Sequence, residues 1–193
     1  MANNGNIKLR PFRDYDEKDV INLFSLEDDN HSLPIVKGTL VKVANDAGWN
    51  ADQELEMLGD VGQSVTNVTS QRYGVAANVA VGTEGSTPIG MLLHDVRETD
   101  ENGEQLKFNP RKAAEMETVI SGQAVPIVSK GIFLYYGSGL AAETPVAGTD
   151  LYLHGNGQIE TGTHGSAVKV GYALGTKDRN SNVLIKLDCD LGR

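Results

Sequence analysis

The chain has few of the residues that several common classes of protein require. Cysteine occurs once, at position 189, so no internal disulfide can form and assembly in the cytosol is expected. Lysine and arginine number 17 against 26 aspartates and glutamates, and the basic residues are scattered. Because phosphate contacts need clustered basic residues, nucleic acid is not an expected partner. The polar start does not resemble a signal peptide, and no apolar run approaches membrane-spanning length, so no membrane partner is expected.

The sequence also shows no residue pattern that is typical of an active site or a cofactor site. Two histidines, His154 and His164, flank a predicted hairpin and could share a metal ion with Asp150 or Glu160. The short His and Cys spacings of common metal sites are missing, so polar loop residues are the favoured interpretation. The cysteine lies between two aspartates, whose charges oppose the thiolate form that a nucleophile requires. We therefore expect no enzyme, no metal and no cofactor.

Short segments rich in branched residues, separated by glycine-containing turns, make up most of the chain. There are 22 glycines, and strands of this length and spacing are typical of a small β-barrel or β-sandwich. Pro126 is expected at the start or the edge of its strand, because proline has no backbone N–H to donate. We predict strands or strand pairs at 35–43, 61–68, 73–81, 89–96, 125–136, 151–159, 168–174 and 183–187.

Only two segments favour a helix. Asn109 is a good helix cap, Pro110 suits the first helical position, and good helix formers follow up to residue 117. Residues 52–58 have a similar composition between a polar cap and a glycine, although a loop that decorates a strand is the alternative. The predicted fold class is therefore mainly β, with one or two short helices.

One phrase of the sequence occurs twice. Residues 34–41 read PIVKGTLV and residues 126–133 read PIVSKGIF, so that Lys37 and Lys130 lie 93 residues apart. Fixed periods indicate repeated architecture. The phrase indicates either an internal duplication with two related halves or two unrelated stretches of similar β sequence. We predict a first β unit at 34–108 and a second at 109–193, either separate or joined in one composite domain.

Residues 1–33 differ from the rest of the chain and are predicted to form an N-terminal arm. A charge-rich stretch at 14–19 precedes an apolar run at 20–26 that is either a helical turn or a strand. We expect the arm to extend and dock, on its own body or on a neighbouring molecule. The alternative is that it forms the first edge strand of the domain.

The order of these pieces resembles a known family. An acidic arm precedes a Pro-Ile-Val opening, and the phrases Gly131–Phe133, Leu151–Leu153 and Val170–Leu174 follow. In this respect the chain resembles the capsid decoration proteins (cement or head-stabilising proteins) of tailed bacteriophages. The resemblance implies a structural virion protein that is assembled in the host cytoplasm and binds the outer surface of the capsid. There it would bridge neighbouring subunits of the major capsid protein, as a homo-oligomer that is most often a trimer.

Under this hypothesis, the predicted contact residues are the apolar residues of the arm that have no place in the predicted β core. They are Ile7, Leu9, Phe12, Tyr15, Val20, Ile21, Leu23 and Phe24. Deletion of residues 1–30 is then expected to leave a folded protein that no longer holds to capsids. Packing of these residues on their own domain is the alternative. The other candidate function is a carbohydrate- or receptor-binding module of a tail fibre or spike, using Trp49, Tyr135, Tyr136 or Tyr152.

Overall fold

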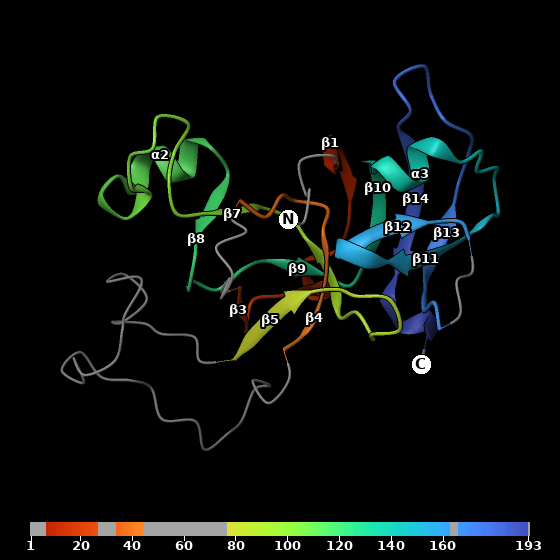
Figure 1. The fold of residues 1–193 in the computed structure, drawn as a ribbon, viewed down its shortest axis with the longest axis horizontal. Coiled ribbons are helices and arrows are strands. Elements are labelled where there is room, and N and C mark those ends of the chain that lie inside the picture. The colour runs from red at the N-terminus through yellow and green to blue at the C-terminus, as the bar shows by residue number, and fades with distance from the viewer. Residues whose placement is uncertain (1–6, 27–33, 45–76, 163–165, 193) are drawn as a thin grey trace.

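Two six-stranded sheets form most of the protein, and a two-stranded sheet extends from them (Figure 1). The computed structural model describes residues 7–26, 34–44, 77–162 and 166–192. The predicted helix at 52–58, the predicted strand at 61–68 and Trp49 lie outside these residues. Strands account for 41% and helices for 16% of the structure, so the predicted mainly β fold class is confirmed.

Sheet A has the strand order β1-β10-β14-β13-β11-β12, and each neighbouring pair is antiparallel. Its strands are β1 (Lys8–Asp14), β10 (Lys130–Tyr136), β11 (Asp150–His154), β12 (Gln158–Glu160), β13 (Lys169–Ala173) and β14 (Val183–Asp188). Alternate side chains point to opposite faces of a strand. Phe133 and Tyr135 are accordingly buried on the inner face of β10, whereas Leu134 between them is half-buried on the outer face.

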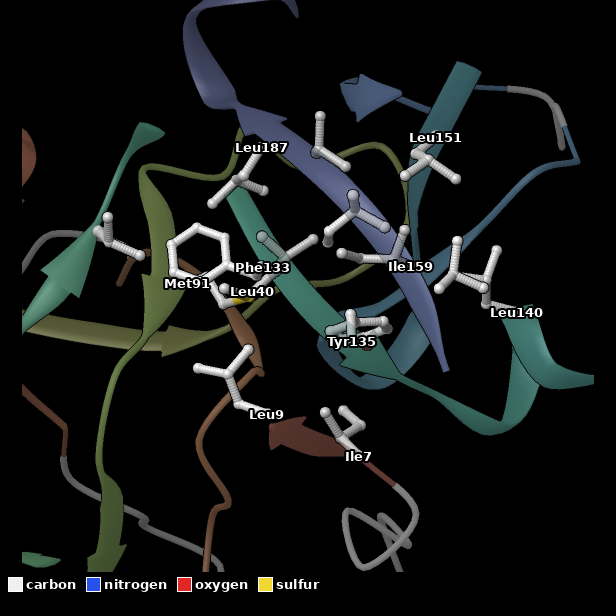
Figure 2. Packing of buried hydrophobic residues seen from close by; sticks show 14 of the residues in the cluster. Ile7, Leu9, Leu40, Met91, Phe133, Tyr135, Leu140, Leu151, Ile159 and Leu187 are labelled. Carbon is white, nitrogen blue, oxygen red and sulfur yellow. The ribbon is translucent and has the colours of Figure 1, made fainter. Parts of the chain in front are cut away.

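Sheet B has the strand order β2-β9-β6-β4-β5-β3, and only β3 and β5 run parallel. Its strands are β2 (Val20–Ile21), β3 (Ser25–Leu26), β4 (Leu40–Val43), β5 (Asn78–Val81), β6 (Gly90–Leu92) and β9 (Ile127–Val128). Both faces of this sheet are buried. Leu40 and Met91 join the cluster beneath sheet A, whereas Val41 and Leu92 belong to a second cluster. Figure 2 shows side chains of both sheets meeting in the first cluster.

The hairpin of β11 and β12 docks on sheet B through its turn, and it confirms the strand pair predicted at 151–159. The turn forms a short 3-10 element, η4 (Gly155–Gly157). Gly157 donates its backbone N–H to the carbonyl of Gly82 at 2.8 Å, and Gly82 donates to Leu40 at 2.8 Å. Gly157 has φ +67°, and a Cβ there would lie 2.5 Å from the Thr39 side chain. Only glycine permits this close contact between the two sheets.

A third, two-stranded sheet carries the helix that the sequence predicted. Sheet C pairs β7 (Asp95–Arg97) in parallel with β8 (Thr118–Ile120), and η3 (Leu106–Phe108) and α2 (Pro110–Glu115) connect them. The Asn109 side chain accepts a hydrogen bond from the Lys112 N–H, which confirms the predicted cap. Leu106, Ala113 and Ile120 form a small core of their own. The other short helices of the described chain are η2 (Glu17–Asp19), α3 (Ser138–Ala142) and η5 (Cys189–Gly192).

The loop before α2 is fixed by a buried carboxylate. Asp100 accepts backbone hydrogen bonds from Asn102 and Glu104, both at 2.8 Å, and pairs with Lys112. The hydrogen bond from Lys112 is the main cause that lowers the pKa of Asp100 from its ordinary value of 3.8, although burial opposes it. The pairing therefore stabilises the folded loop above about pH 4, and this contribution is lost as the pH falls through the lowered pKa.

We expect Asp100→Asn to loosen this loop at neutral pH. The variant cannot form the ion pair, so the amide protons of Asn102 and Glu104 should exchange with solvent much faster than in the wild type. As the pH falls below 3.8 and through the lowered pKa of Asp100, the wild-type carboxylate is protonated and the difference should shrink. Hydrogen exchange at neutral and acidic pH measures both effects, with the exposed neighbour Glu101→Gln as control. Equal exchange of Asp100→Asn and wild type at neutral pH would contradict this prediction.

The repeated phrase does not produce repeated sheets. Leu40 pairs with Met91, so a strict repeat 93 residues later would pair Phe133 with Leu184, but Phe133 pairs with Ile185. In addition, β5 pairs with β4, whereas its counterpart β13 pairs with β14 and β11. The second copy also crosses from sheet B to sheet A at Ser129, between β9 and β10. The likeness is therefore one of local strand sequence and does not extend to the order of strands.

Candidate contact surface

The N-terminal segment lies on the body of its own chain. Strand β1 is the edge of sheet A and pairs with β10 from Lys8–Tyr136 to Asp14–Ile132. Strand β2 pairs with β9, and β3 pairs with β5, so the same segment also supplies both edges of sheet B. The sequence left open whether this segment docks on its own chain or on a neighbouring molecule. In the structure it packs on its own chain. The run at 20–26 forms strands, and the 3-10 turn η2 precedes it.

The structure separates the eight predicted contact residues into different environments. Ile7 and Leu9 are buried in the cluster beneath sheet A, beside Tyr135 (Figure 2). Val20 packs against that cluster, whereas Ile21 and Phe24 pack against the second one. Only two of the set are exposed among those whose side chains are described: Tyr15 at 39% and Leu23 at 57%. The side chain of Phe12, in β1, lies outside the described part of the structure.

Tyr15 is held against the body although it is exposed. Its ring stacks on the buried ring of Phe133, with 6.0 Å between centroids and 21° between planes. Stacked aromatic pairs add roughly 0.5–1.5 kcal/mol beyond their buried area. The exposed edge of Tyr15 is therefore presented in a defined orientation.

A larger apolar surface, which the sequence prediction missed, covers the outer face of sheet A. Leu134 and Leu184 are cross-strand neighbours on β10 and β14, and both are half-buried. Ile132 lies two residues before Leu134 on the same face of β10, opposite Lys186 on β14. Tyr172 in turn lies opposite Lys186 on the next strand. We call this set the sheet A outer face: Ile132, Leu134, Tyr136, Tyr152, Tyr172, Leu184, Lys8, Lys169 and Lys186.

The centre of this face is apolar without an apolar layer over it in the described structure. None of the three buried apolar clusters formed by the described residues includes Ile132, Leu134 or Leu184. Strands with one solvated face usually alternate apolar and polar residues, whereas strands buried on both faces are continuously apolar. The run Ile132–Tyr136 is continuously apolar or aromatic, yet only one of its faces lies in the core. This mismatch between sequence and burial is the signal that could have identified the surface.

Lysines and tyrosines surround the apolar centre. Lys8 lies over the Tyr136 ring at 6.0 Å from its centroid, and Lys186 lies over Tyr172 at 5.7 Å. Lys169 pairs with Asp150 at 2.7 Å, and this pairing raises the pKa of Lys169 above its ordinary 10.5. The face therefore combines an aliphatic centre with a rim of tyrosines, lysines and two carboxylates, since Asp150 lies opposite Tyr172 and Glu160 lies opposite Tyr152.

The residues considered for a metal site come together only in part. His154 and Glu160 lie on adjacent strands, with Nδ1 and Oε2 3.1 Å apart. His164 lies outside the described residues. Among the residues that the structure places, no group of three or more His, Cys, Asp or Glu side chains could hold a metal ion. Cys189 is buried at the start of η5.

The aromatic residues considered for sugar binding also lie in different environments. Tyr135 is fully buried, and this burial raises the pKa of its hydroxyl, although the backbone of Ile159 opposes the shift. Tyr136 and Tyr152 are half-buried on the sheet A outer face. A sugar that stacked on tyrosines would thus use this same face.

Two further observations bear on the class of protein. Across the described ranges, none of the helices has the length and apolar character needed to cross a membrane. Comparison of the chain with protein-family models, with curated proteins and with solved structures gave no match in any of the three.

Proposed function

We propose that the protein is a structural, non-enzymatic component of a phage particle that binds the outer surface of the capsid. There it bridges neighbouring subunits of the major capsid protein and so stabilises the shell. The resemblance of its strand phrases to decoration proteins supports the proposal. The observation that carries it is the sheet A outer face, an apolar centre with a rim of tyrosines, lysines and carboxylates on a six-stranded sheet.

This surface has the composition of a protein interface. Interfaces are enriched in tyrosine, and they surround an apolar centre with a polar rim. The Leu134–Leu184 pair lies in the middle of the six-stranded sheet, between β1 on one side and β13 on the other. Binding there would remove half-exposed aliphatic and aromatic area from water, at roughly 25 cal/mol per Å² of apolar surface. The lysines at the rim would affect the rate of association more than the affinity.

The proposal predicts that one charge at the centre of the face weakens capsid binding. Leu134→Lys would place an ammonium group against the apolar contact area, and loss of a central contact typically costs about 2 kcal/mol or more, about thirtyfold in affinity. Co-sedimentation with particles that lack this protein measures the effect. Val146→Lys is the control, because Val146 is 57% exposed in the loop between α3 and β11 and does not belong to the sheet A outer face. Equal occupancy of Leu134→Lys and Val146→Lys would refute this surface.

The second candidate, a carbohydrate-binding module, is favoured by the tyrosines of the same face. Tyr136, Tyr152 and Tyr172 present half-exposed rings on one side of the sheet. Screening on a glycan array distinguishes the two functions. Glycan hits without any binding to particles would favour the second candidate, whereas binding to particles with no glycan hits would support the first.

A further inference from the structure

Two Asn-Gly pairs lie in turns of the described chain. Asn102–Gly103 lies in the loop between β7 and η3, and Asn156–Gly157 lies in the turn between β11 and β12. A third pair, Asn4–Gly5, lies outside the described residues. In such a pair the backbone nitrogen of the glycine can attack the side-chain amide of the asparagine, because glycine has no Cβ to obstruct the approach. The two turns hold this nitrogen in different ways.

The nitrogen of Gly157 is held where the two large sheets meet. It donates its hydrogen to the carbonyl of Gly82 at 2.8 Å, and Gly157 is buried. A Cβ on Gly157 would lie 2.5 Å from the Thr39 side chain and 2.6 Å from the carbonyl oxygen of Leu40, so the backbone there has no room to move. To attack the Asn156 amide, this nitrogen must give up its hydrogen bond. Reaction at Asn156 therefore requires the hairpin to separate from sheet B.

The Asn102–Gly103 turn is open to solvent. Both residues are exposed, and a Cβ on Gly103 would meet no atom within 4 Å. The Gly103 N–H donates to the carbonyl of Asp100 at 3.2 Å, within the same turn. The side-chain amide of Asn102 forms no hydrogen bond to any residue that the structure describes. Rotations within the turn can therefore bring the nitrogen of Gly103 and the amide of Asn102 together.

The carboxylate of Asp100 restrains this turn. It accepts the backbone N–H groups of Asn102 and Glu104, both at 2.8 Å, and it pairs with Lys112. These bonds hold the backbone on either side of Gly103, so the two reacting groups meet when the loop opens locally. Opening a short exposed loop costs much less free energy than separating two packed sheets. The structure therefore favours reaction at Asn102 over reaction at Asn156.

We propose that Asn102 is a site of spontaneous modification, at which the folded protein converts this asparagine to isoaspartate and aspartate. The Gly103 nitrogen loses its proton to hydroxide and bonds to Cγ of Asn102. The side-chain nitrogen takes a proton from water and leaves as ammonia, which closes a cyclic imide. Water then opens the imide at either of its carbonyl groups, giving isoaspartate or aspartate. The reaction needs only water and hydroxide, and it is independent of the capsid binding proposed above.

The modification should loosen the loop in which it occurs. Isoaspartate carries the main chain through its side-chain carboxyl, which adds one carbon atom to the backbone between the N–H groups of Asn102 and Glu104. Asp100 can then no longer accept both groups in their present positions. Both products also add a negative charge near the Asp100–Lys112 pair, in a loop that already carries Glu101 and Glu104. Modified molecules should therefore lose the order of this loop, while the two large sheets stay intact.

The test is peptide mapping by mass spectrometry of the full-length chain, incubated at mildly alkaline pH either folded or in guanidinium chloride. In the folded protein, Asn102 should convert at least about tenfold faster than Asn156, because reaction at Asn156 requires the sheets to separate. In guanidinium chloride the two should convert at similar rates, since glycine follows both. The rate at Asn102 should rise with pH, because the attacking nitrogen must lose a proton. Equal rates at both sites in the folded protein, or no conversion at Asn102, would overturn the proposal.

Two variants test the restraint by Asp100. Asp100→Asn should speed conversion at Asn102 several-fold, because loss of the ion pair with Lys112 increases the population of open loop. Conversion at Asn156 in the same sample should stay at the wild-type rate. Glu101→Gln, which changes an exposed carboxylate in the same loop, is the control and should convert at close to the wild-type rate. A rate at Asn102 that Asp100→Asn leaves unchanged or lowers would overturn the role assigned to the Asp100 carboxylate.

Discussion

A chain that lacks residues 1–26 is expected to lose its cooperative unfolding transition. The deletion removes the edge strand of sheet A and both edge strands of sheet B. It also removes three buried apolar side chains: Ile7, Leu9 and Leu26. Truncating one buried leucine or isoleucine typically costs about 2–5 kcal/mol, and a whole domain is stable by only about 5–15 kcal/mol. Circular dichroism during urea denaturation measures the loss, and a sharp transition in the truncated chain would contradict it.

Two leucines in this segment provide a matched pair of point variants. Leu26 is 1% exposed and belongs to the second apolar cluster, whereas Leu23 is 57% exposed. Leu26→Ala should lower the free energy of unfolding by about 2–5 kcal/mol. Leu23→Ala should change it by less than about 0.5 kcal/mol. If both variants had the same stability as the wild type, the packing of β3 against β5 could not be as described.

The packing of β1, β2 and β3 in the sheets changes how a deletion experiment should be interpreted. The sequence suggested that removing residues 1–30 leaves a folded protein that cannot bind capsids. Because β1, β2 and β3 are integral to both sheets, loss of binding by such a truncated chain would follow from loss of folding. Point variants on the sheet A outer face, such as Leu134→Lys, separate binding from stability because they leave the inner core unchanged.

The elements that the sequence predicted well are those fixed by local chemistry. Helix α2 has a capping asparagine and a proline at its first position, and both perform these roles. The hairpin β11–β12 lies at the predicted strand pair 151–159, and β13 and β14 lie within about one residue of the predicted strands at 168–174 and 183–187. The loop between them is closed by Asp178, which accepts backbone hydrogen bonds from Asn180 and Asn182 at 2.8 Å. Each of these signals is contained in a few neighbouring residues.

The features that the sequence did not reveal depend on partners far away in the chain. The predicted strand at 89–96 is two strands: β6 pairs with β4 and β9 in sheet B, whereas β7 pairs with β8 in sheet C. Likewise, the predicted strand at 125–136 is split between β9 and β10. Ile7 and Leu9 had no apolar partner nearby in sequence, which suggested a free arm, but they pack with Tyr135. Assignment of strands to sheets follows from such distant contacts, which hydrophobic pattern alone cannot specify.

Strands β13 and β14 approach each other closely at Gly171. Adding a single methyl group at this position is expected to have a large effect on the free energy of unfolding. Gly171 pairs with Leu187 on β14, and on its other side the register with β11 shifts by one residue between Leu151 and Tyr152. This shift is typical of a β-bulge. A Cβ at position 171 would lie 2.1 Å from the carbonyl oxygen of Lys186, which is fixed in the sheet. Since this oxygen belongs to the backbone, the strands themselves must separate to accommodate a side chain.

Gly171→Ala is therefore expected to lower the free energy of unfolding by about 3 kcal/mol or more, the upper range for overpacking a core. Gly175→Ala is the matched control, because Gly175 follows the same strand and a Cβ there meets no atom within 4 Å. The control should change stability by less than about 0.5 kcal/mol, or raise it slightly by restricting the unfolded chain. Urea denaturation of both variants measures the difference. Equal midpoints would show that β13 and β14 can separate at little cost, which would remove the rigid sheet on which the proposed outer contact face depends.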